Sequence, residues 1–113
     1  MTEGRSGTAG GRGRMVPVTM VRLYLTEGTG LLKEIMNKLH DEEKVRGVTV
    51  LRAIAGFGES GRVHSSTLLD LSMDLPIVIE FFDEPEKVAV IIEHLSGLLK
   101  PGRIVSWPAQ VVL

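Results

Sequence analysis

Residues 47–66 read GVTVLRAIAGFGESGRVHSS, a stretch that passes from an apolar segment into a polar one punctuated by glycine. The apolar part is rich in valine, isoleucine and leucine, which is typical of a pleated, well-buried strand. Gly56 and Gly58 flank Phe57 where the polar part begins. We therefore expect a strand with both faces largely covered, and after it a loop.

The glycines make this loop the best candidate for a functional element. A glycine can adopt a positive φ or bring backbone N–H groups against a ligand, which a residue with a Cβ does poorly. Arg62 and His64 follow within the same polar segment. Short Gly-x-Gly motifs are also frequent in ordinary turns, so a strand that ends in a bulge and a plain surface loop explains the same letters.

One strand and one helix are predicted before this stretch. Residues 16–25 have strand composition with one aliphatic face. Thr29 is placed to cap a helix that ends near Val45, with Gly47 close to its C-terminal cap. The apolar positions of this helix recur at helical spacing and form an inner stripe of Leu32, Ile35, Met36 and Leu39.

A strand, a helix and a last strand are predicted after the loop. Pro76 suits a strand start, and residues 77–82 are apolar on both faces apart from Glu80. Residues 83–86 (DEPE) resemble a capping box that starts the second helix. A turn over 100–103 leads into the last strand, which begins at Ile104. The inner stripe of the second helix consists of Val88, Ile91, Ile92, Leu95 and Leu98.

The predicted order of strand, helix, strand, strand, helix, strand is the split βαβ or ferredoxin-like pattern, an α+β fold with a four-stranded antiparallel sheet. Two helices can cover only one face of such a sheet. The second and third strands are nevertheless apolar on both faces, whereas a sheet face open to water should be polar. We therefore expect the uncovered face to pack against copies of itself in a cyclic homo-oligomer.

Length and composition narrow the class of protein. The chain has 113 residues and predicts a single domain over 15–113, preceded by a glycine- and arginine-containing tail over 1–14 that we expect to be disordered. Two other interpretations of residues 1–14 fit the same letters: the natural chain starts at Met15, or the tail is a nucleic-acid-binding Arg-Gly arm. From Met15 onward 10 basic residues face 13 acidic ones, so the domain lacks the basic footprint of a nucleic-acid-binding protein.

The same composition indicates the compartment. The chain has no cysteine, and the sequence contains neither the apolar core of a signal peptide nor a transmembrane segment. We therefore expect a cytoplasmic protein without direct membrane insertion. Secretion is also compatible with the absence of cysteine.

Several segments resemble a known superfamily. Residues 47–50 followed by Gly-Phe-Gly at 56–58 resemble the strand that leads into the T-loop of PII nitrogen-regulatory proteins, and residues 100–105 (KPGRIV) are similar to their phosphate-binding B-loop. The Arg-x-His-Ser segment at 62–65 and the segment DLPIVIE at 74–80 resemble, more closely, the uncharacterised PII-like family called domain of unknown function 190. The resemblance covers roughly residues 18–112.

This resemblance implies a ferredoxin-like homotrimer with lateral clefts between subunits, where PII proteins and several relatives bind adenine nucleotides. It implies that Thr49 lies near the adenine, and that the turn after the second helix meets the phosphates, which suits a guanidinium because it donates paired charge-assisted hydrogen bonds. The nucleotide-binding residues implied in this way are Thr49, Gly56, Gly58, Arg62, Gly102 and Arg103.

Two departures from the PII pattern limit the analogy. The interval from Thr49 to Gly56 is one residue longer than in PII proteins, which requires a bulge or a different pairing register. The glutamine that helps PII bind 2-oxoglutarate falls near Ser60, and the C-terminal arginines that hold the outer phosphates of ATP are missing. We therefore favour AMP or ADP as the regulatory ligand over ATP, and expect no permanently bound cofactor and no sensing of 2-oxoglutarate.

Three functional hypotheses remain at this point. The first is a signalling trimer that binds an adenine nucleotide and presents the loop over 59–72, with Glu59, His64 and Ser65, to an unidentified partner protein. The second is an interaction trimer without a small ligand that regulates a membrane transporter or an enzyme. The third, a small hydrolase, needs a preorganised catalytic constellation that we do not find, so we expect a protein that is not an enzyme.

The remaining titratable residues have plainer interpretations. His40 and His94 lie among charged residues on the predicted helices and should face solvent, and the scattered histidines lack metal-ligand spacing, so we expect no metal site. Asp70 and Asp74 suit loop solvation and capping. Glu80 is the sole carboxylate of its strand, and we expect it either to pair with Arg22 or Arg52 across the sheet or to lie in a subunit cleft.

Overall fold

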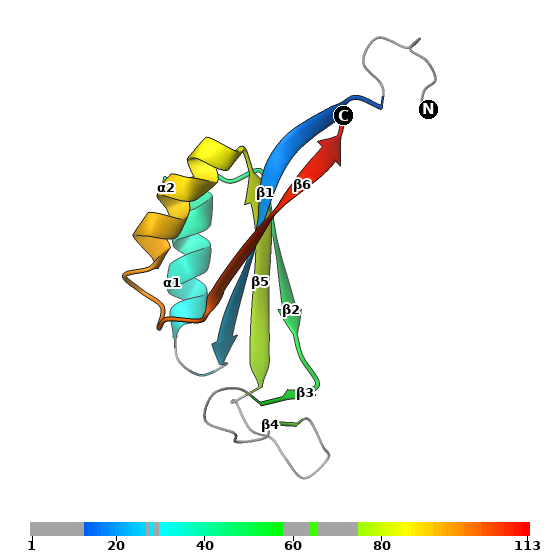
Figure 1. Ribbon diagram of the computed structural model, residues 1–113. Helices are drawn as coiled ribbons and strands as arrows, with labels where there is room; N and C mark the ends of the chain where they lie inside the picture. Colours follow the sequence, from blue (N-terminus) through cyan, green and yellow to red (C-terminus); the bar gives the residue numbers. More distant parts are fainter. Residues whose placement is uncertain (1–12, 27, 29, 58–63, 66–74) are drawn as a thin grey trace.

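The computed structural model describes residues 13–26, 28, 30–57, 64–65 and 75–113. A four-stranded antiparallel sheet carries two helical segments on one face (Figure 1). The elements in chain order are β1 (Met15–Thr26), α1 (Leu31–Asn37), a π-helical turn η1 (Lys38–Glu42), β2 (Gly47–Arg52), β3 (Ala55–Gly56), β4 (His64–Ser65), β5 (Pro76–Asp83), α2 (Pro85–Leu95) and β6 (Ile104–Val112).

The four long strands confirm the ferredoxin-like prediction. Their order in the sheet is β2-β5-β1-β6, so the two strands that come first and third among the long strands lie in the centre. Both neighbours of β1 run antiparallel to it, and so does β2 beside β5. The two-residue strands β3 and β4 pair separately, beyond the end of β2.

Alternation along the central strands places the core between the sheet and the helices. The apolar residues buried on the helix-facing side are Val21, Leu23 and Leu25 of β1 and Ile77, Ile79 and Phe81 of β5; Val18 of β1, whose position in the alternation assigns it to the other side, is also buried. The helices bury the stripes that their periodicity predicted against this face. The helical members of the core are Ile35, Leu39, Val88, Ile91 and Leu95, with Leu32, Met36, Ile92 and Leu98 packed around them.

The first helix ends earlier than its sequence predicted. The helical segment stops at Glu42, not near Val45, and Gly47 begins β2 and does not cap the helix. The turn is made by Lys44, which adopts a left-handed φ of 53°, and the Val45 amide donates to the Leu39 carbonyl at 3.1 Å. The sequence analysis expected a glycine, Gly47, at the end of the helix, but the left-handed residue there is Lys44. The predicted cap Thr29 lies outside the described residues.

The prediction that both faces of the 47–55 strand are covered is wrong for the single chain. β2 is an edge strand, and apart from Val48 its residues are exposed, with Leu51 49% exposed. The apolar pattern reports that the strand is hydrophobic, but it contains no information about its place in the sheet. Among the described residues of one chain, only those of α1, η1 and α2 form a layer over a face of this sheet.

The start of β1 and the end of β6 are paired and project past the helical layer, next to the C label in Figure 1. Backbone hydrogen bonds between Arg14 and Leu113 in both directions, at 3.2 and 2.8 Å, extend this two-stranded ribbon beyond Met15. The fold measures 56 × 31 × 23 Å with a radius of gyration of 17.3 Å. A compact domain of this length would have a radius of about 13 Å.

No helix in the described part of the chain has the length and apolar character that spanning a bilayer requires.

Candidate functional site at the two edges of the sheet

Thr49 and Gly56 lie along one edge of the sheet. Thr49 is exposed on β2 directly opposite Glu80, on the face away from the helices. The Ala53 amide donates to the Pro76 carbonyl at 2.8 Å, which is the last contact of β2 with β5 before Ile54 leaves the ladder. The chain then pairs with β4 as β3. The extra residue between Thr49 and Gly56 thus coincides with a change of strand partner.

Gly56 lies close to the side chain of Pro76. A Cβ added at Gly56 would approach the Pro76 Cγ at 3.1 Å, which is tighter than ordinary van der Waals contact. Its strand partner is His64, whose neighbour Ser65 pairs with Ala55. The segment before the candidate loop is therefore paired, at residues 55–56, with residues 64–65.

Several candidate residues lie on or beyond these stems. Gly58, Glu59 and Arg62 lie outside the described residues, as do Asp70 and Asp74, so their predicted roles stay predictions. His64 and Ser65 are described through their backbone pairing in β4. Phe57 is the last described residue before the loop, and its side chain is 74% exposed.

The turn over residues 100–103 lies at the opposite edge of the sheet. Gly102 has a φ of +86°, a conformation that suits glycine, and the Arg103 amide donates to the Lys100 carbonyl at 3.3 Å. The Arg103 carbonyl accepts from the Tyr24 amide at 2.9 Å, so Arg103 continues the ladder between β6 and β1. The Arg103 side chain is half-buried.

The register puts Thr49 and Arg103 on the same face of the sheet. Thr49 pairs with Glu80, Glu80 pairs with Arg22, and Arg103 lies two residues before Val105, the partner of Arg22 on β6. Two strands, β5 and β1, separate them. Neighbouring strands lie about 4.8 Å apart, so the two backbones are separated by about 14 Å across the sheet. The two halves of the predicted site therefore do not meet within one chain.

An ion pair lies on this open face between the two edges. Arg22 Nε donates to Glu80 Oε2 at 2.7 Å, which confirms one of the pairings expected for Glu80. The Arg22 guanidinium also lies over the Trp107 ring, 5.5 Å from its centroid, in cation–π geometry. The hydrogen bond to Glu80, with a smaller contribution from Tyr24, raises the pKa of Arg22 above its ordinary value. Sequence reasoning missed Trp107, which lies two residues from Val105.

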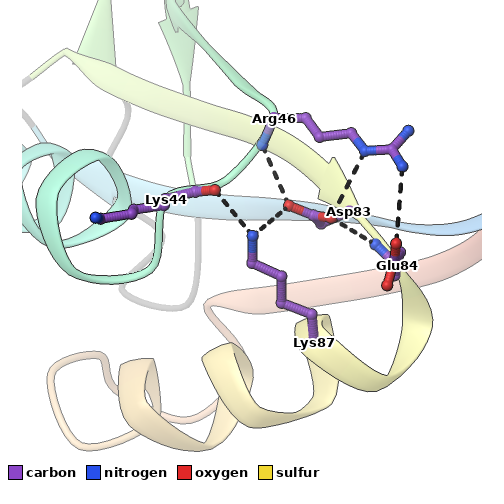
Figure 2. Close-up of polar contacts among 5 residues, drawn as sticks. All are labelled: Lys44, Arg46, Asp83, Glu84 and Lys87. Atoms are coloured by element: carbon purple, nitrogen blue, oxygen red, sulfur yellow. Dashed lines mark hydrogen bonds and ion pairs between the residues drawn. The ribbon is translucent and has the colours of Figure 1, made fainter.

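A buried carboxylate fixes the start of β2 against the start of α2. Asp83, 3% exposed, accepts hydrogen bonds from the backbone amides of Glu84 at 2.8 Å and Arg46 at 3.2 Å. The Lys87 ammonium lies 3.0 Å from the same carboxylate and donates to the Lys44 carbonyl at 2.8 Å (Figure 2). We call these contacts the Asp83 latch.

The latch differs from the predicted capping box. The N-cap of α2 is Glu84, and its side chain makes no cap hydrogen bond. Asp83 instead binds the segment before β2, because the Arg46 amide of that segment donates to its carboxylate. Burial by itself would raise the pKa of Asp83, but the Glu84 amide, the Lys87 ammonium and the Arg46 amide together hold that pKa below its ordinary value. A signal for this role was present in Lys87, four positions after Asp83, and in Arg46, whose Nε lies 3.7 Å from the carboxylate.

Both described histidines of the helical layer face solvent, as predicted. His40 bonds to the neighbouring Asp41, and His94 bonds to Glu43, each at 2.7 Å. Across residues 13–26, 28, 30–57, 64–65 and 75–113, no group of three or more His, Cys, Asp or Glu side chains could hold a metal ion.

The family model for domain of unknown function 190 (DUF190, "Uncharacterized ACR") matches residues 19–111. The chain belongs to the DUF190 family. An Aquifex aeolicus UPF0166 protein is 32% identical over 89 residues, which cover 74% of this chain and 84% of that protein. A UPF0166 protein of Methanocaldococcus jannaschii is 28% identical over 95 residues, covering 80% and 87%.

Solved structures show that this DUF190 chain has the PII-like fold. CPII from Thiomonas intermedia, solved with ADP and bicarbonate, matches with a TM-score of 0.67 and 23% identity over 89% of this chain and 94% of that one. A PII-like signalling protein from Thermus thermophilus matches with a TM-score of 0.56 and 19% identity, covering 88% and 91%. At these identities the likeness is one of fold.

Proposed function

We propose that this DUF190 protein is a PII-like regulatory protein that binds an adenine nucleotide between subunits of a cyclic homotrimer. Thr49 and Gly56 contact the nucleotide from one subunit, and Gly102 and Arg103 contact its phosphates from the next. Binding changes the order of the loop over 59–72, which a partner protein in the cytoplasm then recognises. The role is regulatory and not enzymatic.

The observation that carries this proposal is the placement of Thr49 and Arg103 on one sheet face at opposite edges. A nucleotide that touches both requires the β2 edge of one copy to meet the β6 edge of another, because β5 and β1 intervene within a chain. A cyclic arrangement brings every such pair of edges together and leaves neither exposed. CPII, which shares the fold, has been solved with ADP and with AMP.

AMP or ADP suits the described residues better than ATP. The turn over 100–103 supplies one guanidinium, from Arg103, together with backbone amides near Gly102. One guanidinium binds one phosphate group in bidentate fashion. A triphosphate would need further cations, and we place Arg62 of the loop as a candidate for the second phosphate.

A second function is favoured by a separate observation. Ile54 and Phe57 are both strongly exposed at the stem of the loop, next to the paired strands β3 and β4. Apolar side chains held by a rigid stem suit a protein partner. In this alternative the assembly regulates a transporter or an enzyme through these residues without a nucleotide.

Isothermal titration with AMP, ADP and ATP, together with the mass from light scattering, distinguishes the nucleotide-binding function from the nucleotide-independent one. A trimer that binds AMP or ADP supports the first proposal, whereas a trimer that binds none of the three supports the second. A monomer that binds nucleotide would overturn the inter-subunit site.

Mixing two defective variants tests the shared site directly. Thr49→Phe blocks the β2 side and Arg103→Ala removes the turn cation, so neither variant alone should bind with wild-type affinity. In a co-refolded equimolar mixture, about a quarter of the interfaces combine an intact β2 edge with an intact turn, since assembly is random. Recovery of about that fraction of sites is expected. No recovery would show that the residues do not act across subunits.

A further inference from the structure

Little buried surface fixes the register of β2, the edge strand that carries Thr49. All six residues of β2 are described, and Val48 alone among them packs against the core, where it is half-buried. The backbone hydrogen bonds of a ladder also form in a slipped register, so a strand with little buried surface is weakly specified. A slip of one residue would turn Thr49 from the open face to the face toward the helices.

The contact between Asp83 and the Arg46 amide depends on the register of β2. Asp83 directly follows Phe82, the partner of Gly47 at the start of β2. The Arg46 amide, one residue before β2, donates to the Asp83 carboxylate at 3.2 Å. A slip of β2 by one residue would carry this amide about 3.4 Å along β5, beyond hydrogen-bond distance. The contact therefore exists in the observed register and is lost in a slipped one.

Lys87 of α2 ties the same carboxylate to the segment before β2. Its ammonium lies 3.0 Å from Asp83 and donates to the Lys44 carbonyl at 2.8 Å (Figure 2). Lys44 has a φ of 53°, a left-handed conformation that is unfavourable for a residue with a Cβ. The hydrogen bond from Lys87 stabilises this turn, two residues before Arg46. The first turn of α2 thus fixes the point at which β2 begins.

The burial of Asp83 makes these contacts selective for one register. Its side chain belongs to a residue that is only 3% exposed, and a buried carboxylate is costly when it lacks partners. In the observed register the partners include the amides of Glu84 and Arg46 and the Lys87 ammonium. Removal of one partner of a buried charge costs more than the loss of an exposed hydrogen bond. A slip of β2 is therefore penalised at Asp83, although the exposed side chains of β2 tolerate it.

We propose that Asp83, together with Lys87, is a positioning residue that fixes the register of β2 and thereby places Thr49 at the nucleotide. The nucleotide part of this inference rests on the proposed function. Asp83 does not touch the ligand, since Thr49 lies opposite Glu80, three residues along β5, which corresponds to about 10 Å. The Asp83 latch acts through the backbone of β2.

Two variants that disrupt the latch are compared with two matched controls. Asp83→Asn removes the charge, and Lys87→Met removes the ammonium but keeps the aliphatic stem. Lys33→Met, on the exposed side of α1, controls for the lost positive charge, and Ile91→Val, a buried change in α2, controls for a general loss of stability. Isothermal titration with ADP gives the affinities. Hydrogen exchange followed by mass spectrometry compares peptides from β2 with peptides from β1.

Both latch variants should raise the dissociation constant for ADP about threefold or more, because the observed affinity falls with the fraction of chains in the competent register. Hydrogen exchange should accelerate in β2 but not in β1. Both control variants should bind ADP as the wild type does. Wild-type affinity in the latch variants would overturn the proposal. Equal acceleration in β1 and β2, or a matching loss of affinity in Ile91→Val, would do the same, because either result indicates a purely structural role.

The two measurements distinguish a failure of this inference from a failure of the proposed function. A wild-type protein that binds neither AMP nor ADP would overturn the proposed function. Selective acceleration of exchange in β2 by both latch variants would then still support their role in fixing the register. Without that acceleration, the positioning role would be overturned as well.

Discussion

The two faces of the sheet differ in a way that sequence periodicity does not show. On the covered face, Ile79 and Phe81 lie under the helices with 0% and 1% exposure. On the open face, Val78 and Phe82 are half-buried, and the Arg22–Glu80 pair lies among them. Adjacent residues of one strand therefore belong to two different environments. The covered face stabilises the single chain, whereas the open face is the one on which we propose both the assembly of subunits and the nucleotide site.

The most direct test of this difference between the two faces is a matched pair of alanine substitutions on β5. Phe81→Ala should lower the free energy of unfolding by about 3–5 kcal/mol, the usual cost of a large cavity in a packed core. Phe82→Ala should cost the single chain less than about 1.5 kcal/mol, because its side chain is partly exposed already. Urea denaturation below the association midpoint measures both; Phe81→Leu replaces Phe81→Ala if the latter does not fold. Equal losses would contradict the division into two faces.

The second prediction concerns the edges of the open face. Arg103→Ala should weaken binding of AMP or ADP by about 1.5–3 kcal/mol, the range for hydrogen bonds to a charged group, and should leave the oligomeric mass unchanged. Lys100→Ala removes a neighbouring exposed cation from the same turn and is the control for net charge. Isothermal titration gives the affinities. Unchanged binding by the Arg103 variant would remove this turn from the site.

The third prediction tests the Asp83 latch on the covered side. Asp83→Asn should lower the free energy of unfolding at pH 7 by about 1–2 kcal/mol, since the charge-assisted contacts with Lys87 and the two amides weaken. The folded-state pKa of Asp83 lies below the unfolded value of about 3.9, so its stabilisation is present above that pH.

The pH dependence of this stability difference tests whether it comes from the Asp83 charge. As the pH falls below about 4 and through the folded pKa, the Asp83 carboxylate is protonated and its extra stabilisation is lost. The difference between wild type and Asp83→Asn in chemical denaturation should therefore shrink below about pH 4. Glu84→Gln, an exposed neighbour, should show no such convergence. A constant difference down to pH 2 would contradict the assigned role.

The smallest expected effect is that of the ion pair on the open face. Glu80→Gln should change the stability of the single chain by less than about 1 kcal/mol, because partly exposed ion pairs contribute little. If a second copy covers this face, the same change should cost more in the oligomer, where the pair is desolvated. Unfolding measured above and below the association midpoint compares the two states. An identical effect in both would place the pair outside the interface.

The sequence was a good guide where a single strand or helix carries its own signal. The alternation of Val21, Leu23 and Leu25 and the helical stripe through Val88, Ile91 and Leu95 identify their core faces directly, because side-chain direction follows the backbone period. The order of elements then restricted the fold to the ferredoxin-like topology. The end of the first helix was misplaced, because Lys44 takes a left-handed conformation that composition assigns to glycine.

The candidate site was harder to predict. The sequence and the PII resemblance nominated Thr49, Gly56, Gly102 and Arg103, but not the arrangement of these residues, since strands adjacent in space are distant along the chain. Asp83 was expected to cap a helix, and its amide partner at Arg46 lies 37 positions away. Trp107 drew no attention, because its contact with Arg22 exists only once β6 lies beside β1.

By itself, the sequence determined which residues are apolar, with what period, and in what order the strands and helices follow one another. Those are local properties, set by side-chain chemistry and backbone geometry. The tertiary structure alone decided that β2 and β6 are the edges and that the described helices cover one face of the sheet. It also decided that the two halves of the proposed site lie about 14 Å apart across the sheet, three strand spacings. Pairing between distant segments fixes these features, and no stretch of sequence encodes its partner.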